Sequence, residues 1–327
     1  MPTARPADDA PVRLPHPHPF DPAYGYGLAA LRAIAPPDEV AGFAPFWRGT
    51  YEACLATPLR LEVGEPLPID GDRICRIVRF DTFAGHRIGA WWTMPADGVV
   101  EAGVVAGHGY GGRSGPGGDW APPRAAEIAP CAPGFDLSAA ADLPATSDRH
   151  VVHGIASRDT YLIRACVAAT WSAASALLAL APDVGRSLWY AGGSFGGGLG
   201  ALALPWDARF ARACLIVPTF GHHPLRLRCP CVGSGESVRR HAAAHPEVVD
   251  VLAYYDAAVA ARRIAIPTVV VPARFDPAVP PPGQFAVANA IAGARVVPIT
   301  AGHHDNPDEV ADQRAVRAAL TALAASG

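Results

Sequence analysis

The chain contains no lysine: of its 327 residues, the 27 counted as Lys or Arg are all arginine. Without a side-chain amine, the protein cannot form a Schiff base, anchor pyridoxal phosphate, use a Ser–Lys dyad or supply the lysine of a phosphate-binding P-loop. Any group that activates a nucleophile in this protein must therefore be of another chemical type.

A strong net charge, a disulfide framework and a signal-peptide core are also missing. The 30 acidic and 27 basic residues leave a net charge of −3, too small to recruit nucleic acid or an anionic membrane. Seven cysteines without a Cys-x-x-Cys pair fit a reducing compartment. Residues 1–22 are proline-rich, and the most apolar stretch, 166–182, is typical of a buried helix. We expect a cytoplasmic protein that binds neither nucleic acid nor membrane.

Hydrophobic residues make up 50% of the chain, enough for a large buried core. Periodicity and turn residues predict helices at 38–56, 161–181, 195–203, 283–292 and 307–325, and strands at 59–63, 74–83, 87–94, 104–106, 187–191, 213–217, 268–271 and 295–299. Strands that alternate with helices of this size form a mostly parallel sheet with helices on both faces. The sequence therefore predicts an α/β fold.

The sharpest motif is the glycine-rich segment 192–198, with Ser194 at its centre, between an expected strand and an expected helix. This context is that of a nucleophile elbow, a strained turn that exposes a serine hydroxyl at the carboxyl edge of a sheet. A turn with an idle serine is one alternative. A dinucleotide-binding loop is another, although it would require a first strand near the start of the domain and a later acidic partner.

A serine nucleophile needs a base that is itself oriented by a carboxylate. Asp276 follows the expected strand 268–271, and His303 and His304 follow the expected strand 295–299. The chain order serine, acid, histidine is that of a hydrolase triad. A metal site at His303, His304 and Asp305 is the competing interpretation, but adjacent residues rarely converge on one ion and a second ligand cluster is missing. We expect neither a metal nor a cofactor.

A second glycine-rich loop, His108-Gly109-Tyr110-Gly-Gly-Arg113, follows the expected strand 104–106. Acyl transfer needs two donors aimed at the developing oxyanion, and one of them comes from such a loop. We expect the backbone N–H groups of Tyr110 and Phe195 to form this oxyanion hole. A plain glycine-rich loop is the alternative. His108, Gly109 and Trp120 are candidates for lining the substrate pocket.

Together these motifs resemble the acetyl xylan esterase / cephalosporin C deacetylase family, carbohydrate esterase family seven of the α/β-hydrolase superfamily. The matching segments are His108–Arg113 with Asp119-Trp120, His153-Gly-Ile155 with Asp159-Thr-Tyr161, the Ser194 elbow, Ala253–Asp256 leading to Ile266-Pro267, and Phe275-Asp276 with Pro280-Pro281. The resemblance implies an α/β-hydrolase fold, metal-free removal of acetyl groups from small sugars and related alcohols, and a cytoplasmic homo-oligomer. We expect an N-terminal arm and helical extension at 1–58, and a catalytic domain at 59–327 with a helical excursion near 220–263.

Two features depart from the family pattern. Phe195 stands where the family usually has glutamine, and Pro133-Gly-Phe135 stands where an Arg-Gly-Gln tripeptide is expected. The family's terminal His-Glu pair aligns with His304-Asp305, which favours His304 as the base. A generic Gly-x-His pattern favours His303 instead.

The sequence thus predicts a serine esterase for short-chain, acetyl esters of small molecules, with Ser194, His304 and Asp276 as its triad and His303 as the alternative base. Two other functions remain open at this point. The altered pocket could serve another ester, a lactone or an amide, or the chain could be a non-catalytic binding protein on a hydrolase fold.

Overall fold

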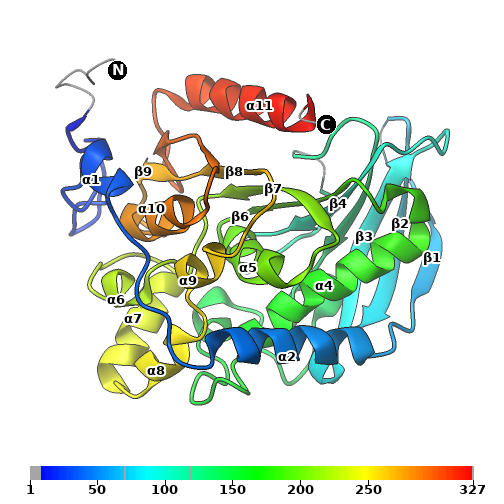
Figure 1. The fold of residues 1–327 in the computed structure, drawn as a ribbon, viewed down its shortest axis with the longest axis horizontal. Helices are drawn as coiled ribbons and strands as arrows, with labels where there is room; N and C mark the ends of the chain where they lie inside the picture. Colours follow the sequence, from blue (N-terminus) through cyan, green and yellow to red (C-terminus); the bar gives the residue numbers. More distant parts are fainter. Residues whose placement is uncertain (1–8, 70, 118–119, 326–327) are drawn as a thin grey trace.

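The computed structural model describes residues 9–69, 71–117 and 120–325. A mixed sheet of nine strands lies at its centre, in the spatial order β1-β2-β3-β5-β4-β6-β7-β8-β10 (Figure 1). These strands are β1 (Glu62–Leu67), β2 (Arg73–Asp81), β3 (Arg87–Pro95), β4 (Ala102–Gly107), β5 (Ala125–Pro130), β6 (Leu188–Gly193), β7 (Phe210–Ile216), β8 (Thr268–Val271) and β10 (Arg295–Val296). Strands β1 to β3 and β5 pair antiparallel, and the pairs from β5 to β10 are parallel. The predicted α/β fold is confirmed.

Several strands differ from the prediction, and two of them, β5 and β1, lie in the part of the sheet before the elbow. Strand β5 was not predicted, because Ala125-Ala-Glu-Ile-Ala-Pro130 has few of the β-branched and aromatic residues that favour strands, yet every residue in it is buried. Strand β1 begins three residues later than the expected strand 59–63. Its Gly64 and Pro66 are tolerated because β1 is an exposed edge strand with an irregular register.

Helices cover both faces of the sheet. The helices of the described residues are α1 (Leu28–Arg32), α2 (Phe43–Ala56), α3 (Ser147–His150), α4 (Ile163–Leu180), α5 (Phe195–Ala203), α6 (His223–Arg226), α7 (Ser234–Ala244), α8 (Val248–Ala253), α9 (Ala257–Ala261), α10 (Pro281–Ala290) and α11 (Glu309–Ala325). Helices α4 and α5 pack on one face with α2 outside α4, and α11 covers the opposite face (Figure 1). Val104 and Val105, neighbours on β4, accordingly belong to two different core clusters.

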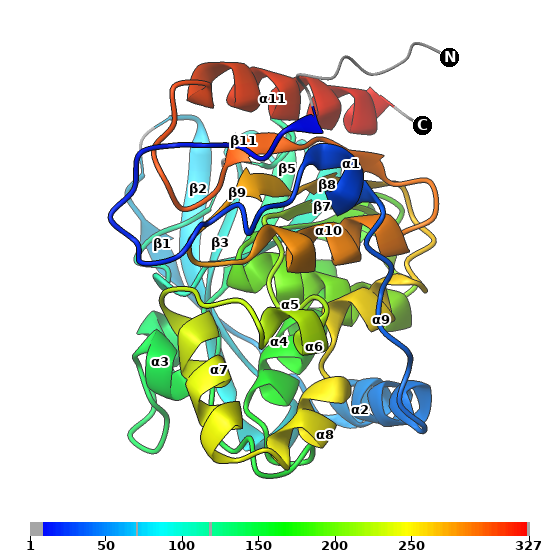
Figure 2. The same ribbon diagram turned by 90° about the vertical axis from the view of Figure 1, so that its left-hand side faces the viewer.

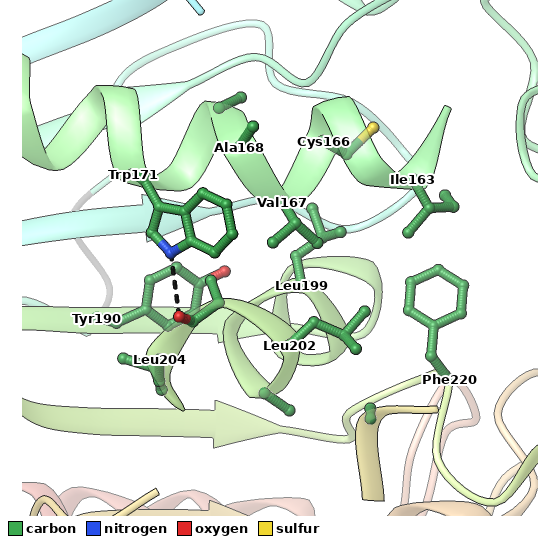
Figure 3. Packing of buried hydrophobic residues seen from close by; sticks show 14 of the residues in the cluster. Ile163, Cys166, Val167, Ala168, Trp171, Tyr190, Leu199, Leu202, Leu204 and Phe220 are labelled. Atoms are coloured by element: carbon green, nitrogen blue, oxygen red, sulfur yellow. Dashed lines mark hydrogen bonds between the residues drawn. The ribbon is translucent and has the colours of Figure 1, made fainter. Parts of the chain in front are cut away.

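The larger core cluster is built around α4. Trp171 of this helix is fully buried, and its indole N–H donates to the carbonyl of Ala203 at 3.0 Å. Figure 3 shows the side chains of α4 packed against Tyr190, Leu199 and Leu202. Helix α4 is long and apolar enough to cross a membrane, but 72% of it is buried inside the protein, as expected of the central helix of a layered core.

The N-terminal segment from residue 9 to α1 is irregular and lies along strands β9 (Ala273–Phe275) and β11 (Ile299–Ala301) (Figure 2). Ala23 is fully buried and packs in a small cluster with Phe275 and Ala301. The backbone N–H of Asp276 donates to the carbonyl of Pro22 at 3.1 Å. The predicted arm is therefore attached to the segment that carries the candidate acid; its residues 1–8 lie outside the described residues, as does Asp119.

The expected excursion near 220–263 lies between β7 and β8 and contains helices α6 to α9. It places these short helices beside the carboxyl ends of the central strands (Figure 2), which is where ligands bind in parallel α/β sheets.

Candidate active site

Ser194 occupies the sharp turn between β6 and α5. Its backbone has φ 54° and ψ −111°, a left-handed conformation that costs energy in a non-glycine residue. A Cβ atom on Gly196 would lie 2.7 Å from the backbone of Gly107, so only glycine allows the helix to approach this closely. The structure therefore has the elbow that the motif predicts, with Ser194 at the N-terminus of α5.

His303 and Asp276 complete a chain of hydrogen bonds from the serine. The His303 Nε2 atom lies 3.0 Å from Ser194 Oγ, and its Nδ1 atom lies 2.9 Å from Asp276 Oδ2. Strands β9 and β11 create this proximity, because they pair in parallel immediately before the acid and the histidine. Neither of these three-residue strands was predicted with these bounds.

Asp276 is fully buried and its carboxylate has several donors. Oδ1 accepts from the backbone N–H groups of Ala278 and Val279, both at 2.9 Å. Oδ2 accepts from the side-chain amide of Gln284 at 2.9 Å in addition to its contact with His303. Asp276 thus caps the turn that follows it through Oδ1 and contacts the histidine through Oδ2.

The expectation that His304 faces the serine is corrected by the geometry. The His304 Nε2 atom lies 3.0 Å from the carbonyl oxygen of Pro15, and its ring packs on Phe275 at 5.0 Å between centroids. His303 has a left-handed backbone, with φ 49°, which turns the two adjacent side chains in different directions. The alternative base, His303, is the ring that contacts Ser194.

The protonation of His303 is controlled by two opposing effects. Burial lowers the pKa of the ring, but the hydrogen bond to Asp276 and the charge of that carboxylate together hold the pKa above its ordinary value of 6.5. The ring therefore retains a proton more readily than a free histidine, as a group that accepts the serine proton must.

Two backbone amides are available beside Ser194. Phe195 is the first residue of α5, so its N–H has no partner inside the helix. In the described part of the chain, the N–H of Tyr110 donates to no other residue. The loop of Tyr110 lies close to the nucleophile, since a Cβ atom on Gly109 would be 3.8 Å from the Ser194 Cβ. These two amides are the predicted oxyanion donors.

The buried ring of His108 holds the loop that carries Tyr110 through two hydrogen bonds. Its Nε2 accepts the backbone N–H of Ala132 at 2.9 Å, so the proton is on Nδ1, which lies 2.7 Å from the carbonyl of Gly109. Burial lowers the pKa of His108, which favours the neutral ring that the bond from Ala132 requires. It holds the loop in place and is unsuited to act as a second base.

The segment Pro133-Gly-Phe135, where the family tripeptide was expected, packs an aromatic ring against the residues around the same loop. Phe135 lies within 5.7 Å of the His108 ring and 4.8 Å of the His150 ring. The ring of Tyr110 stacks on that of Phe195 at 4.0 Å. Phe195, which replaces the usual glutamine, is therefore part of a buried aromatic cluster. Sequence reasoning did not single out His150, because a lone histidine has no motif around it.

A cleft of about 510 Å³ opens over Ser194, and its lining includes the predicted pocket residues His108, Gly109 and Trp120 together with Arg113 and Glu127. A second cleft of about 570 Å³ adjoins it on the side of the histidine pair, and Trp120 lines both. The two clefts together offer room for an alcohol group considerably larger than an acetyl group.

The residues of the candidate metal site do not converge. His303 points to Ser194 and Asp276, whereas His304 points to Pro15. Among the residues with described positions, no group of three or more His, Cys, Asp or Glu side chains is arranged to hold a metal ion. The chemistry that this site offers is therefore acid–base and nucleophilic.

These features define an α/β hydrolase: a mixed sheet in this strand order, a serine elbow after β6, and a histidine that bridges the serine to a buried carboxylate. The family model described as acetyl xylan esterase (AXE1) matches residues 32–317. The chain belongs to this family, and it is a carboxylic ester hydrolase. No curated protein sequence is significantly similar to the chain.

Solved structures agree on the fold. The acetyl xylan esterase from Paenibacillus sp. R4 matches with a TM-score of 0.76 and 21% identity, over 90% of this chain and 99% of its own. Acetyl xylan esterase 1 from Thermoanaerobacterium sp. JW/SL YS485 gives 0.75 and 20%, over 92% and 99%. The acylaminoacyl peptidase from Pyrococcus horikoshii is more distant, at 0.54 and 13%, over 76% and 40%.

Proposed function

We propose that the protein is a serine esterase that removes acetyl groups from small-molecule esters through a triad of Ser194, His303 and Asp276. The observation that supports this most directly is the continuous hydrogen-bond chain from Ser194 Oγ through the His303 ring to Asp276 Oδ2. Membership of the acetyl xylan esterase family supports the choice of acyl group.

In this proposal Ser194 Oγ attacks the ester carbonyl carbon while His303 Nε2 takes its proton. The resulting oxyanion is bound by the N–H groups of Tyr110 and Phe195, and Asp276 stabilises the imidazolium. The tetrahedral intermediate expels the alcohol, which receives the proton from His303. Water then attacks the acetyl-enzyme by the same route, releasing acetate and restoring the Ser194 hydroxyl.

We also propose a preference for short acyl groups, and the packing beneath the elbow supports it. Phe195 is fully buried, and its ring stacks on Tyr110 and meets the ring of Phe220 edge-on at 6.0 Å. We infer that the acyl group of the substrate points toward these rings, and a long acyl chain would then have to displace them. We expect kcat/KM for p-nitrophenyl esters to fall at least about tenfold between acetate and octanoate.

The same series of esters tests the main alternative, a hydrolase for larger esters, lactones or amides. The volumes of the two clefts beside Ser194 and the histidine pair, about 510 and 570 Å³, are the observation that favours this alternative. A rate that rises with acyl length, or turnover of a lactone in preference to acetate, would contradict the acetyl assignment. A screen of acetylated sugars against acetylated aromatic alcohols would then identify the alcohol group.

The raised pKa of His303 predicts the pH dependence of the reaction. The base must be neutral to accept the Ser194 proton, so kcat/KM is lost as the pH falls through the pKa of His303. Because Asp276 holds this pKa above 6.5, we expect the acid limb of the kcat/KM profile to have its midpoint above pH 6.5. A midpoint clearly below that value, measured with acetate esters between pH 5 and 9, would show that a different group limits the reaction.

A further inference from the structure

Gln284 is the buried polar side chain of helix α10 that contacts the candidate acid. It is fully buried, and the other buried residues of α10 have no polar side chains. Its Nε2 atom donates to Asp276 Oδ2 at 2.9 Å and to the carbonyl oxygen of Val279 at 2.6 Å. Its Oε1 atom accepts the backbone N–H of Ala273 at 2.7 Å. A main-chain donor and a main-chain acceptor thus fix which way the amide points.

The two oxygens of Asp276 are held in different ways. Oδ1 is bound by the turn amides of Ala278 and Val279. These two bonds meet at one oxygen, so they do not by themselves fix the rotation of the carboxyl group about it. Oδ2, the oxygen that faces His303 Nδ1, is bound by Gln284. The Gln284 amide therefore supplies the second point that defines the plane of the carboxylate.

We propose that Gln284 is a positioning residue for catalysis, which fixes Asp276 Oδ2 so that His303 presents Nε2 to Ser194. This inference rests on the proposed function of these three residues. Gln284 touches neither the serine nor the cleft, so it acts through the acid. Gln284 and His303 both donate hydrogen bonds to Asp276 Oδ2, so both stabilise the negative charge of that carboxylate.

Gln284→Met tests this proposal, since methionine has a similar shape and no donor. We expect kcat for p-nitrophenyl acetate to fall about 10- to 100-fold with KM changed less than about threefold, as for other residues that orient a catalytic group. The acid limb of the kcat/KM profile should also move to higher pH. With one donor removed, more of the Asp276 charge acts on His303, which raises the pKa of the ring.

Asn289 provides the matched control on the same helix. Its side-chain amide donates to the carbonyls of Leu31 and Ile34, both at 2.9 Å, and does not contact the triad. Asn289→Leu should lower the melting temperature and leave the pH profile unchanged. If Gln284→Met behaves in the same way, Gln284 is merely structural and the proposal is wrong.

A second variant keeps the test usable if Gln284→Met does not fold. In Gln284→Glu, one oxygen still accepts from Ala273 and the other meets Asp276 Oδ2. Ionisation of this second carboxyl would repel Asp276 and rotate it, so we expect a new loss of activity at alkaline pH. A profile identical to that of the unmodified protein would overturn the proposal.

The Ser194→Ala variant separates this inference from the proposed function. If Ser194→Ala retains activity, the triad itself is wrong. If Ser194→Ala is inactive and Gln284→Met is folded with normal kcat and a normal pH profile, only the positioning role fails. In a His303→Ala background, Gln284→Met should cause less than about a twofold further loss, because residues that act as a unit are not additive.

Discussion

Ser194→Ala is expected to lower kcat for p-nitrophenyl acetate by at least about 10⁴-fold, because the acyl-enzyme cannot form without the Oγ atom. Stability should change little. Alanine occupies the same left-handed position with the same strain, and the backbone bond from residue 194 to the carbonyl of Ile216 is retained. The comparison should be made on purified proteins with matched circular dichroism spectra and melting temperatures.

Covalent labelling gives an independent measurement of the same prediction. A fluorophosphonate should modify Ser194 stoichiometrically, and mass spectrometry of the digested protein should find the adduct on the elbow peptide. Ser237 on α7 is a suitable control, since it is a partly exposed serine whose hydroxyl donates to the carbonyl of Gly233, the residue before its own helix. Ser237→Ala should keep full activity and labelling. Turnover by Ser194→Ala close to that of the unmodified protein would remove both the triad and the esterase mechanism.

The second large expected effect is a loss of kcat that differs between the two adjacent histidines. His303→Ala should lower kcat about 10³- to 10⁴-fold, because the ring that bridges Ser194 Oγ and Asp276 Oδ2 is lost. His304→Ala should retain activity within about tenfold. The free energy of unfolding of His304→Ala should instead fall by about 1 kcal/mol, because the hydrogen bond to the Pro15 carbonyl is lost.

The pair is its own matched control, because both substitutions remove an imidazole from the same loop. Initial rates at saturating acetate ester and denaturant melts of both variants provide the comparison. Equal losses of kcat would mean that the loop as a whole, rather than His303 alone, is required. A larger loss for His304→Ala would restore the assignment suggested by the family alignment.

The sequence was sufficient to identify Ser194 as the candidate nucleophile, because the elbow is a local structure. Strand β6, the glycines and helix α5 are contiguous in the chain, and the close packing at Gly196 leaves room for glycine alone. The same locality explains why helix α4 and the hairpin of β2 and β3 were predicted with small errors at their ends. Strand β5 was missed because its burial comes from helix α4 and from the strands on either side of it, which a single segment does not reveal.

The choice between His303 and His304 could not be made from the sequence. It depends on a left-handed backbone at His303 and on the two short strands β9 and β11. Gln284 was also missed, because a glutamine in a helix is ordinary and only its burial beside Asp276 distinguishes it. These features arise from tertiary contacts between segments that are separate in the chain.

The contacts of the N-terminal segment have a consequence for what esterase activity measures. Pro15 and His304 are 289 positions apart, and Pro22 meets Asp276 across a similar separation. These residues are irregular and contribute almost nothing to the helical signal in a circular dichroism spectrum. A chain whose two ends have failed to join can therefore keep its sheet and helices while its acid and base loops lose their support. Turnover, rather than secondary-structure content, reports whether the first and last parts of this chain have been correctly assembled.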